Sequence, residues 1–512
     1  MELAPKVAGA SSRSDLQRDA LATIAPAPIS GFDKTRRKVA GLLLCLVVAV
    51  GLPAISLQAE QIKAGAAVGD ITPQVWPAPL VGNYQTRYAT EAADPLLARA
   101  LVLDDGSTRL AIVTVDSCLV ARKVFDEAKR LASEATGIRT DRMLMAATHT
   151  HSAPPAADTF LYQTDESYLA VLRQGIVDAV KRAADNLEPA ELGWGTVDVP
   201  QHVFNRRWHM KPGGIVPNPF GETTDQVRMN PPRDRALLDR PAGPTDPEVA
   251  FISVRSSGGR PIAVLANYSL HYVGGVPAER VSADYFGEFA KQIKRRVASH
   301  SDTESPPFVG ILSNGTSGDI NNINFLNPRG RREPFEQIRQ VAEDVADEVF
   351  ESWQHVEYRD DVTLAMAQRE VELGLRRPTQ EQIRRAQEFL AEPDESKLPR
   401  NAKPYAKITL LFAEMQPTDR LILQALRIGD VGITAIPCEV FVEIGLEIKQ
   451  RSPHQRTFTV ELANGWNRYL PTPRQHRLGG YETWLGTNML EVKASDKITN
   501  VVLELLNEVK QP

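Results

Sequence analysis

The sequence predicts an α/β (α+β) fold in which layered, mixed β-sheets are flanked by helices. Hairpins of apolar strands are interspersed with amphipathic helices, which is the pattern of a layered domain with mixed sheets. No internal repeat and no Pro/Gly/Ser-rich linker divides the sequence, so residues 60–512 are expected to form a single large domain. The composition, 42% hydrophobic and 24% charged over 512 residues, excludes disordered, collagen-like and coiled-coil proteins.

Strand and helix signals follow one another along this domain. Leu97–Leu103 and Arg109–Val115 predict a hairpin, because both runs are apolar and the segment between them has turn chemistry. A helix is expected from Ala121 to Ala135, closed by Gly137. Residues 199–247 are too polar and proline-rich to be core, and they predict a long functional or disordered loop. The other expected elements are strands at 143–147, 249–254, 262–267, 308–312, 362–371, 408–413, 421–428 and 431–435, and helices at 168–186, 285–298, 335–353, 379–391 and 493–509.

The N-terminus has the features of a cleaved secretory signal peptide. A basic cluster at residues 34–38 precedes the apolar run Val39–Val50, and Leu57-Gln58-Ala59 supplies a cleavage site before Glu60. Residues 1–59 are therefore interpreted as a leader and signal peptide that is removed, which predicts a periplasmic or secreted protein. The alternative is a membrane-anchored scaffold, because the interrupted apolar run to Leu57 approaches the roughly 20 residues that a membrane span needs.

Charge excludes one class of partner. The full chain has a formal net charge of −5 and contains no long block of lysine and arginine, so nucleic acid is not an expected partner. Removal of residues 1–59, with seven basic and four acidic side chains, would leave the exported chain at −8. Cys118 and Cys438 both lie in apolar stretches, which favours buried thiols over a disulfide between them.

Ionisable side chains follow three apolar strands. His149 and His151 come directly after the run at 143–147, and residues i and i+2 of an extended chain point to the same side. His271 and Glu439 end two other apolar runs, where an ionisable group is costly to desolvate unless it is paired. An isolated His-x-His is more often part of a solvated loop. The combined pattern nevertheless indicates a cation site, and zinc is the expected metal.

The block Thr148-His149-Thr150-His151-Ser152-Ala153-Pro154 resembles the Thr-His-Thr-His-Ser-Gly-Pro signature of the neutral/alkaline non-lysosomal ceramidases. Further similar segments occur in the family's order from residue 65 to residue 472, so the resemblance covers nearly all of the expected domain. These segments are 65–73, 97–103, 204–206, 282–285, 314–319, 437–439 and 463–472.

The resemblance implies a site and a reaction. It implies Zn²⁺ held by His149, His271, Glu439 and Tyr469, with His151 and Arg206 as catalytic residues, in an enzyme that hydrolyses the amide bond of N-acyl sphingoid bases. Tyr469 rests on the resemblance alone, because residue patterns do not single it out among eleven tyrosines. Without the resemblance, Arg206 would be interpreted as a surface arginine. His151 is expected to transfer protons and Arg206 to stabilise the oxyanion.

Two departures from the family pattern widen the choice of substrate. Asn321 stands where ceramidases have a serine, and the chain ends forty residues after Thr472, which predicts that the C-terminal β-sandwich of well-known ceramidases is absent. The substrate is expected to be a small-molecule or lipid N-acyl compound, with possible contact to a membrane surface. Alternatives are a zinc hydrolase of the same fold that cleaves a non-sphingolipid amide or ester, and a non-catalytic exported binding protein. Asp319, which orients either a ligand or a loop, and Glu443 are the next candidates for a general base.

Overall fold

The computed structural model describes residues 61–82, 86–159, 161–297, 306–328, 330 and 332–511. The predicted signal peptide and the alternative membrane anchor lie outside these residues. No helix in the described part of the chain has both the length and the hydropathy to cross a membrane.

The larger of the two main sheets has eight strands of mixed direction. Its edge strands, β16 and β7, also contact each other, so the sheet curls toward closure. The pairs β6–β7 and β14–β16 are parallel and the remaining neighbours are antiparallel. In spatial order the strands are β16 (Val309–Asn314), β14 (Pro261–Tyr268), β13 (Glu248–Ser256), β8 (Glu188–Asp198), β1 (Lys63–Asp70), β5 (Leu97–Asp104), β6 (Arg109–Val115) and β7 (Met143–Ala147).

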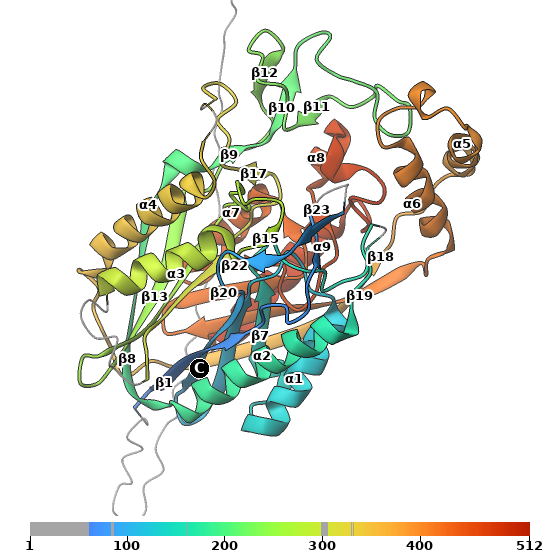
Figure 1. Cartoon of the computed structure of the whole chain (residues 1–512). Helices are drawn as coiled ribbons and strands as arrows, with labels where there is room; N and C mark the ends of the chain where they lie inside the picture. Colours follow the sequence, from blue (N-terminus) through green and yellow to red (C-terminus); the bar gives the residue numbers. More distant parts are fainter. Residues whose placement is uncertain are drawn as a thin grey trace, which may run out of the picture. The chain divides into compact units, whose positions relative to one another are not determined.

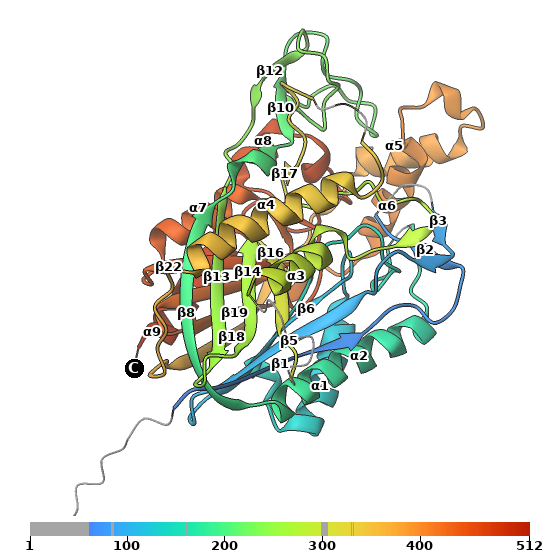
Figure 2. The ribbon, with the colours of Figure 1, turned by 60° about the vertical axis from the view of Figure 1, so that its left-hand side comes forward.

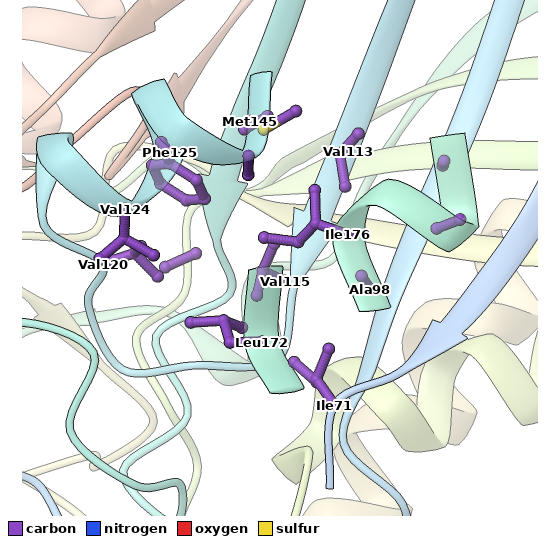
Figure 3. Close-up of a cluster of buried hydrophobic side chains, with 14 of the residues drawn as sticks. Ile71, Ala98, Val113, Val115, Val120, Val124, Phe125, Met145, Leu172 and Ile176 are labelled. Carbon is purple, nitrogen blue, oxygen red and sulfur yellow. The ribbon is translucent and has the colours of Figure 1, made fainter. Parts of the chain in front are cut away.

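Two pairs of helices cover the outer face of this sheet (Figure 1, Figure 2). Helices α1 (Arg122–Thr136) and α2 (Glu166–Asp185) pack on β1, β5, β6 and β7. Figure 3 shows Phe125 of α1 and Leu172 and Ile176 of α2 gathered around Val113 and Val115 of β6. Helices α3 (Asp284–Val297) and α4 (Glu336–Trp353) pack over β13, β14 and β16.

The second main sheet lies against the inner face of the first. It contains β18 (Leu364–Gly374), β19 (Thr418–Ile428), β20 (Val431–Ile436) and β22 (Arg456–Glu461). Apolar side chains of both sheets form one buried layer between them. The outer face of the second sheet is covered by α6 (Ala402–Glu414), α7 (Val442–Arg451) and α9 (Ala494–Lys510). The layers are therefore helix, sheet, sheet and helix, as one layered α/β domain requires.

Shorter elements connect these layers. They are β2 (Ala78–Leu80), β3 (Arg87–Ala89), β4 (Glu91–Ala92), β9 (Phe204–Asn205), β10 (Arg207–Met210), β11 (Val227–Met229), β12 (Leu238–Pro241), β15 (Arg280–Val281), β17 (Ile320–Asn321), β21 (Glu439–Val440), β23 (Tyr469–Leu470), α5 (Gln380–Ala391) and α8 (Pro473–Leu478).

The predicted fold class is confirmed, and two local predictions are wrong. The run at 408–413 was predicted as a strand but belongs to helix α6. The buried residues of this helix follow helical spacing, and they include Tyr405, Ile408, Thr409 and Phe412. The segment 199–247 was predicted to lie outside the core, but part of it is buried. It carries fully buried polar side chains such as Arg207. Strands β1, β8 and β22 of the two main sheets and helix α7 were not predicted.

A buried lysine on α1 makes the stability of this fold depend on pH. Lys129 is 3% exposed, and its Nζ donates to Asn464 Oδ1 at 2.6 Å. Burial lowers the pKa of Lys129 from 10.5 to about 8. Between these two pH values the unfolded chain binds more protons than the folded chain, so the free energy of unfolding rises with pH.

We expect wild type to gain about 3 kcal/mol of unfolding free energy over the Lys129→Met variant between pH 8 and 10.5. Urea titrations at several pH values measure this difference. Lys181→Met, which changes an exposed lysine on α2, serves as the control and should run parallel to wild type. A constant difference between wild type and Lys129→Met across the window would contradict the prediction.

Candidate metal centre and active site

The ends of three strands, two in the first sheet and one in the second, bring the predicted ligands together. His149 follows β7, His271 follows β14, and Glu439 begins β21 directly after β20. The backbone joins the two sheets at this point, because Ala147 N–H donates to the Leu462 carbonyl at 3.2 Å. All three ligand side chains are buried, with exposed fractions of 4% or less.

The distances between these side chains fit a tetrahedral metal site. His149 Nε2 lies 3.0 Å from His271 Nε2 and 3.5 Å from Glu439 Oε2. Ligands at the usual zinc distances of 2.0–2.1 Å are about 3.3 Å apart along a tetrahedral edge. The ligand atoms of all three residues lie within 4.8 Å of one another. The three side chains therefore form a group compatible with a bound metal ion.

His149 is oriented by the backbone of the segment that follows β6. Its Nδ1 donates to the Cys118 carbonyl at 2.7 Å, and its backbone N–H donates to the Ser117 carbonyl at 2.8 Å. The φ angle of His149 is 77°, an uncommon left-handed conformation for a residue with a side chain. The chain is therefore not extended at His149 as expected, although His149 and His151 do face one cavity as predicted.

Hydrogen bonds also orient His271. Its Nδ1 faces the Ser317 carbonyl at 3.2 Å, and Ser317 Oγ donates to the buried Glu461 carboxylate at 2.7 Å. Glu461 also accepts the Val440 N–H at 2.7 Å. A partner on Nδ1 leaves Nε2 free for a metal, as is usual for ligand histidines. Ser317 lay in a segment singled out from the sequence, but Glu461 did not.

His151 lies beside the candidate ligands. Its Nε2 is 3.2 Å from His149 Nε2, and its ring stacks on Tyr272 with the centroids 3.7 Å apart. The backbone of Gly82 lies so close to Nδ1 that a side chain there would collide with the ring. Burial lowers the pKa of His149, His151 and His271, so all three imidazoles favour the neutral form that binds metals or accepts protons.

Tyr469 is directly opposite Glu439. The two residues are partners in the short parallel pair β21–β23, and Trp466 Nε1 donates to Glu439 Oε1 at 3.2 Å. Burial and the Glu439 carboxylate raise the pKa of the Tyr469 phenol, whereas Arg206 lowers it. The structure therefore places the fourth ligand implied by the resemblance beside the third.

Arg206 is buried, so the interpretation as a surface arginine is wrong. Its Nη2 donates to Tyr469 Oη at 3.0 Å and to the Gly318 carbonyl at 2.8 Å. Its Nε donates to Glu482 at 3.1 Å, and Glu482 also pairs with Arg207 at 2.6 Å. Glu482 is fully buried and fixes the direction of Arg206. No sequence signal pointed to Glu482, which lies 276 positions from Arg206.

A cavity of about 130 Å³ is lined by His149, Glu439 and Tyr469 among other residues. Its described walls carry one carboxylate, Glu439, and one arginine, Arg468. The remaining walls are mostly apolar or aromatic, which suits an acyl chain. Those residues include Val81, Leu119, Leu161, Tyr162, Tyr405, Trp466 and Tyr481.

The two other candidate bases have structural partners. Burial raises the pKa of Asp319 to about 6, and its carboxylate accepts hydrogen bonds from Asn205 at 2.8 Å and from the Val442 N–H at 2.9 Å. Asp319 therefore orients loops. Glu443 pairs with Arg474 at 2.6 Å and accepts hydrogen bonds from Thr472 and Gln475 at the start of α8.

Two further positions from the sequence are also placed. Asn321, at the position of the family's serine, donates to Asn230 Oδ1 at 2.6 Å. Cys118 and Cys438 are separate buried thiols, as predicted. Cys118 lines the cavity, and its Sγ lies 3.8 Å from His149 Nδ1.

Comparisons with known proteins agree with this fold. The chain is similar to a neutral ceramidase structure from Pseudomonas aeruginosa, with a TM-score of 0.66 and 16% identity over 87% of this chain and 74% of that one. A ceramidase structure complexed with C2 gives a TM-score of 0.65 and 16% identity over 88% and 75% of the two chains. Neutral ceramidase A of Dictyostelium discoideum is 21% identical over 235 residues, which span 44% of this chain and 30% of that protein.

A match to a family model assigns the chain to a family more firmly than these individual similarities do. The model for neutral/alkaline non-lysosomal ceramidase, N-terminal, matches residues 62–332, which is more than half of the chain. This region contains His149, His151, Arg206 and His271, while Glu439 and Tyr469 lie beyond it. The chain belongs to the neutral/alkaline non-lysosomal ceramidase family.

Proposed function

We propose that this protein is a zinc-dependent hydrolase that cleaves the amide bond of an N-acyl lipid, as a ceramidase does. The observation that carries the proposal is the convergence of His149 Nε2, His271 Nε2 and Glu439 Oε2 at the spacing of tetrahedral ligands. Imidazole and carboxylate donors suit zinc, and Tyr469 is the proposed fourth ligand. Zinc bound by these residues would polarise the acyl carbonyl and lower the pKa of a bound water.

His151 is the proposed proton carrier. Its neutral imidazole lies beside the ligand set, where it accepts a proton from the attacking water and returns it to the leaving amine. The Tyr272 ring holds the plane of His151 through stacking. No serine or cysteine nucleophile is needed in this scheme, which agrees with Asn321 at the position of the family's serine and with the burial that raises the pKa of Cys118.

Arg206 is proposed to act through Tyr469. Its guanidinium donates to the phenol oxygen, and a fixed positive charge at 3.0 Å favours the ionised phenol that would bind a metal. The same cation lies close enough to the ligand set to stabilise negative charge that develops on the acyl oxygen. Glu482 keeps Arg206 in this orientation.

Removal of the metal should abolish hydrolysis. We expect purified protein to release fatty acid from at least one member of a panel of N-acyl amines, which includes ceramide, and to lose this activity after dialysis against a chelator. Zinc added back should restore it. Mass spectrometry of the products, with zinc content measured in the same samples, gives the result. Undiminished turnover in a sample shown to be free of metal would refute the proposal.

A further inference from the structure

Arg468 lines the active-site cavity without an acidic partner. Its guanidinium lies over the rings of Trp466, at 4.9 Å from the centroid, and Phe412, at 5.7 Å, and its Nη1 donates to the Gly486 carbonyl. Among the residues that the structure describes, no carboxylate lies within 4.0 Å of it. A guanidinium carries five N–H donors, so most of those on Arg468 remain available to a molecule in the cavity.

The arginines of the described chain that are less than a tenth exposed have carboxylate partners. Arg206 pairs with Glu482 at 3.1 Å, and Arg99 pairs with Asp116 at 2.7 Å. A charged group taken out of water is costly unless an opposite charge compensates for it. Arg468 differs because its side chain faces the cavity, where a bound molecule can supply that charge.

Arg468 lies close to the proposed metal ligands, where the amide bond would be cleaved. The Trp466 ring on which it lies donates to Glu439, and Tyr469 follows it in the chain. The cation is therefore about one side chain away from the proposed metal ligands. Glu439 is the one carboxylate in the described walls of the cavity, and it is committed to the metal in the proposed function. The cavity thus presents a fixed positive charge to the substrate.

We propose that the substrate carries a carboxylate on its amine half, which makes it an N-acyl amino acid. The carboxylate pairs with the free edge of the Arg468 guanidinium, and the acyl chain lies along the apolar walls. A carboxylate carries a single negative charge, which one arginine neutralises. Water adds its hydroxyl to the acyl carbon and a proton to the nitrogen, so the C–N bond breaks to give a fatty acid and an amino acid.

This inference rests on the proposed hydrolase and defines its substrate class. Two substrates of equal acyl length test it with the zinc-loaded enzyme: N-lauroylglycine, which carries the carboxylate, and N-lauroylglycinamide, which is neutral. We expect wild type to favour N-lauroylglycine in kcat/KM by about 10- to 100-fold, the range of a hydrogen bond to a charged group.

Variants of Arg468 then assign the preference to this side chain. Arg468→Gln keeps an N–H donor for Gly486 but removes the charge, so it should raise KM for N-lauroylglycine and leave kcat/KM for N-lauroylglycinamide within about twofold. Arg468→Lys should retain part of the preference. Arg400→Gln, which changes an exposed arginine of a different cavity, is the control and should behave like wild type.

Several results would overturn the inference. Equal losses on both substrates in Arg468→Gln would mean that Arg468 serves the reaction or the fold rather than recognition. No preference for N-lauroylglycine in wild type would exclude the carboxylate site, even if the variants failed to fold. Preference for N-lauroylethanolamine phosphate over N-lauroylglycine would assign the site to a phosphate.

A binding measurement separates this inference from the proposed function. Calorimetry with the ketomethylene analogue of N-lauroylglycine, in which CH₂ replaces the amide N–H, reports recognition without turnover. Binding that needs Arg468, together with no hydrolysis of any amide, would contradict the amidase and keep the anion site. Hydrolysis that does not depend on the charge of the substrate would support the amidase and contradict the anion site.

Discussion

His271→Ala is expected to lose its bound zinc and to lose hydrolysis with it. His271 Nε2 lies 3.0 Å from His149 Nε2 in the proposed ligand set, and alanine leaves a site of two neighbouring side chains plus Tyr469. The affinity of the variant for zinc should be too low to retain the metal during purification, because each ligand contributes directly to zinc binding. Elemental analysis and the N-acyl amine assay, run on the same preparation, measure both losses.

The control for this variant is an exposed histidine. His355→Ala changes a side chain at the end of α4 and should retain full zinc and activity. Circular dichroism establishes that His271→Ala is folded before its zinc is measured. One zinc per chain in a folded, fully active His271→Ala protein would remove His271 from the metal centre.

The second large effect separates the two histidines of the Thr-His-Thr-His block. His149→Ala should lose zinc and activity together. His151→Ala should keep zinc and yet lose about 10²- to 10⁴-fold in turnover, the usual contribution of a positioned acid or base. This difference follows from the structure, in which His149, unlike His151, belongs to the set with His271 and Glu439.

A second grouping in the structure defines the opposing result. Cys118, His149 and His151 also bring their ligand atoms within 4.8 Å of one another. Equal zinc loss in His149→Ala and His151→Ala would therefore indicate a clamp of two histidines. His151 would then be a metal ligand, and the proton carrier would have to be another group of the cavity.

The fold class could be predicted because local patterns are strong where strands and helices are amphipathic. Strands β5 and β6 and helix α1 end within a residue of their predicted boundaries, with Gly137 in the left-handed conformation that ends the helix. The strand prediction for residues 408–413 was wrong because this short run, with five apolar residues and Thr409, shows no helical period by itself. Their helical identity became clear only through Tyr405, which lies outside the run.

Three members of the proposed site were within reach of sequence reasoning because an ionisable group after a buried strand is unusual. Those positions are His149, His271 and Glu439. The groups that orient them were not accessible, because Cys118 and Ser317 act through backbone carbonyls that every residue has. Glu482 acts across 276 positions. Such partners are determined by tertiary packing and cannot be predicted from the pattern of residues along the sequence.

The origin of the proposed ligands in both sheets makes zinc a cross-link between layers. His149 and His271 extend from the eight-stranded sheet, whereas Glu439 and Tyr469 belong to segments that follow the four-stranded sheet. Binding would close chain loops that span residues 149 to 469, and closing long loops restricts the unfolded chain most. A nascent chain lacks two of the proposed ligands until synthesis has passed Glu439 and Tyr469. Metal capture by the full proposed set would therefore follow synthesis of both sheets.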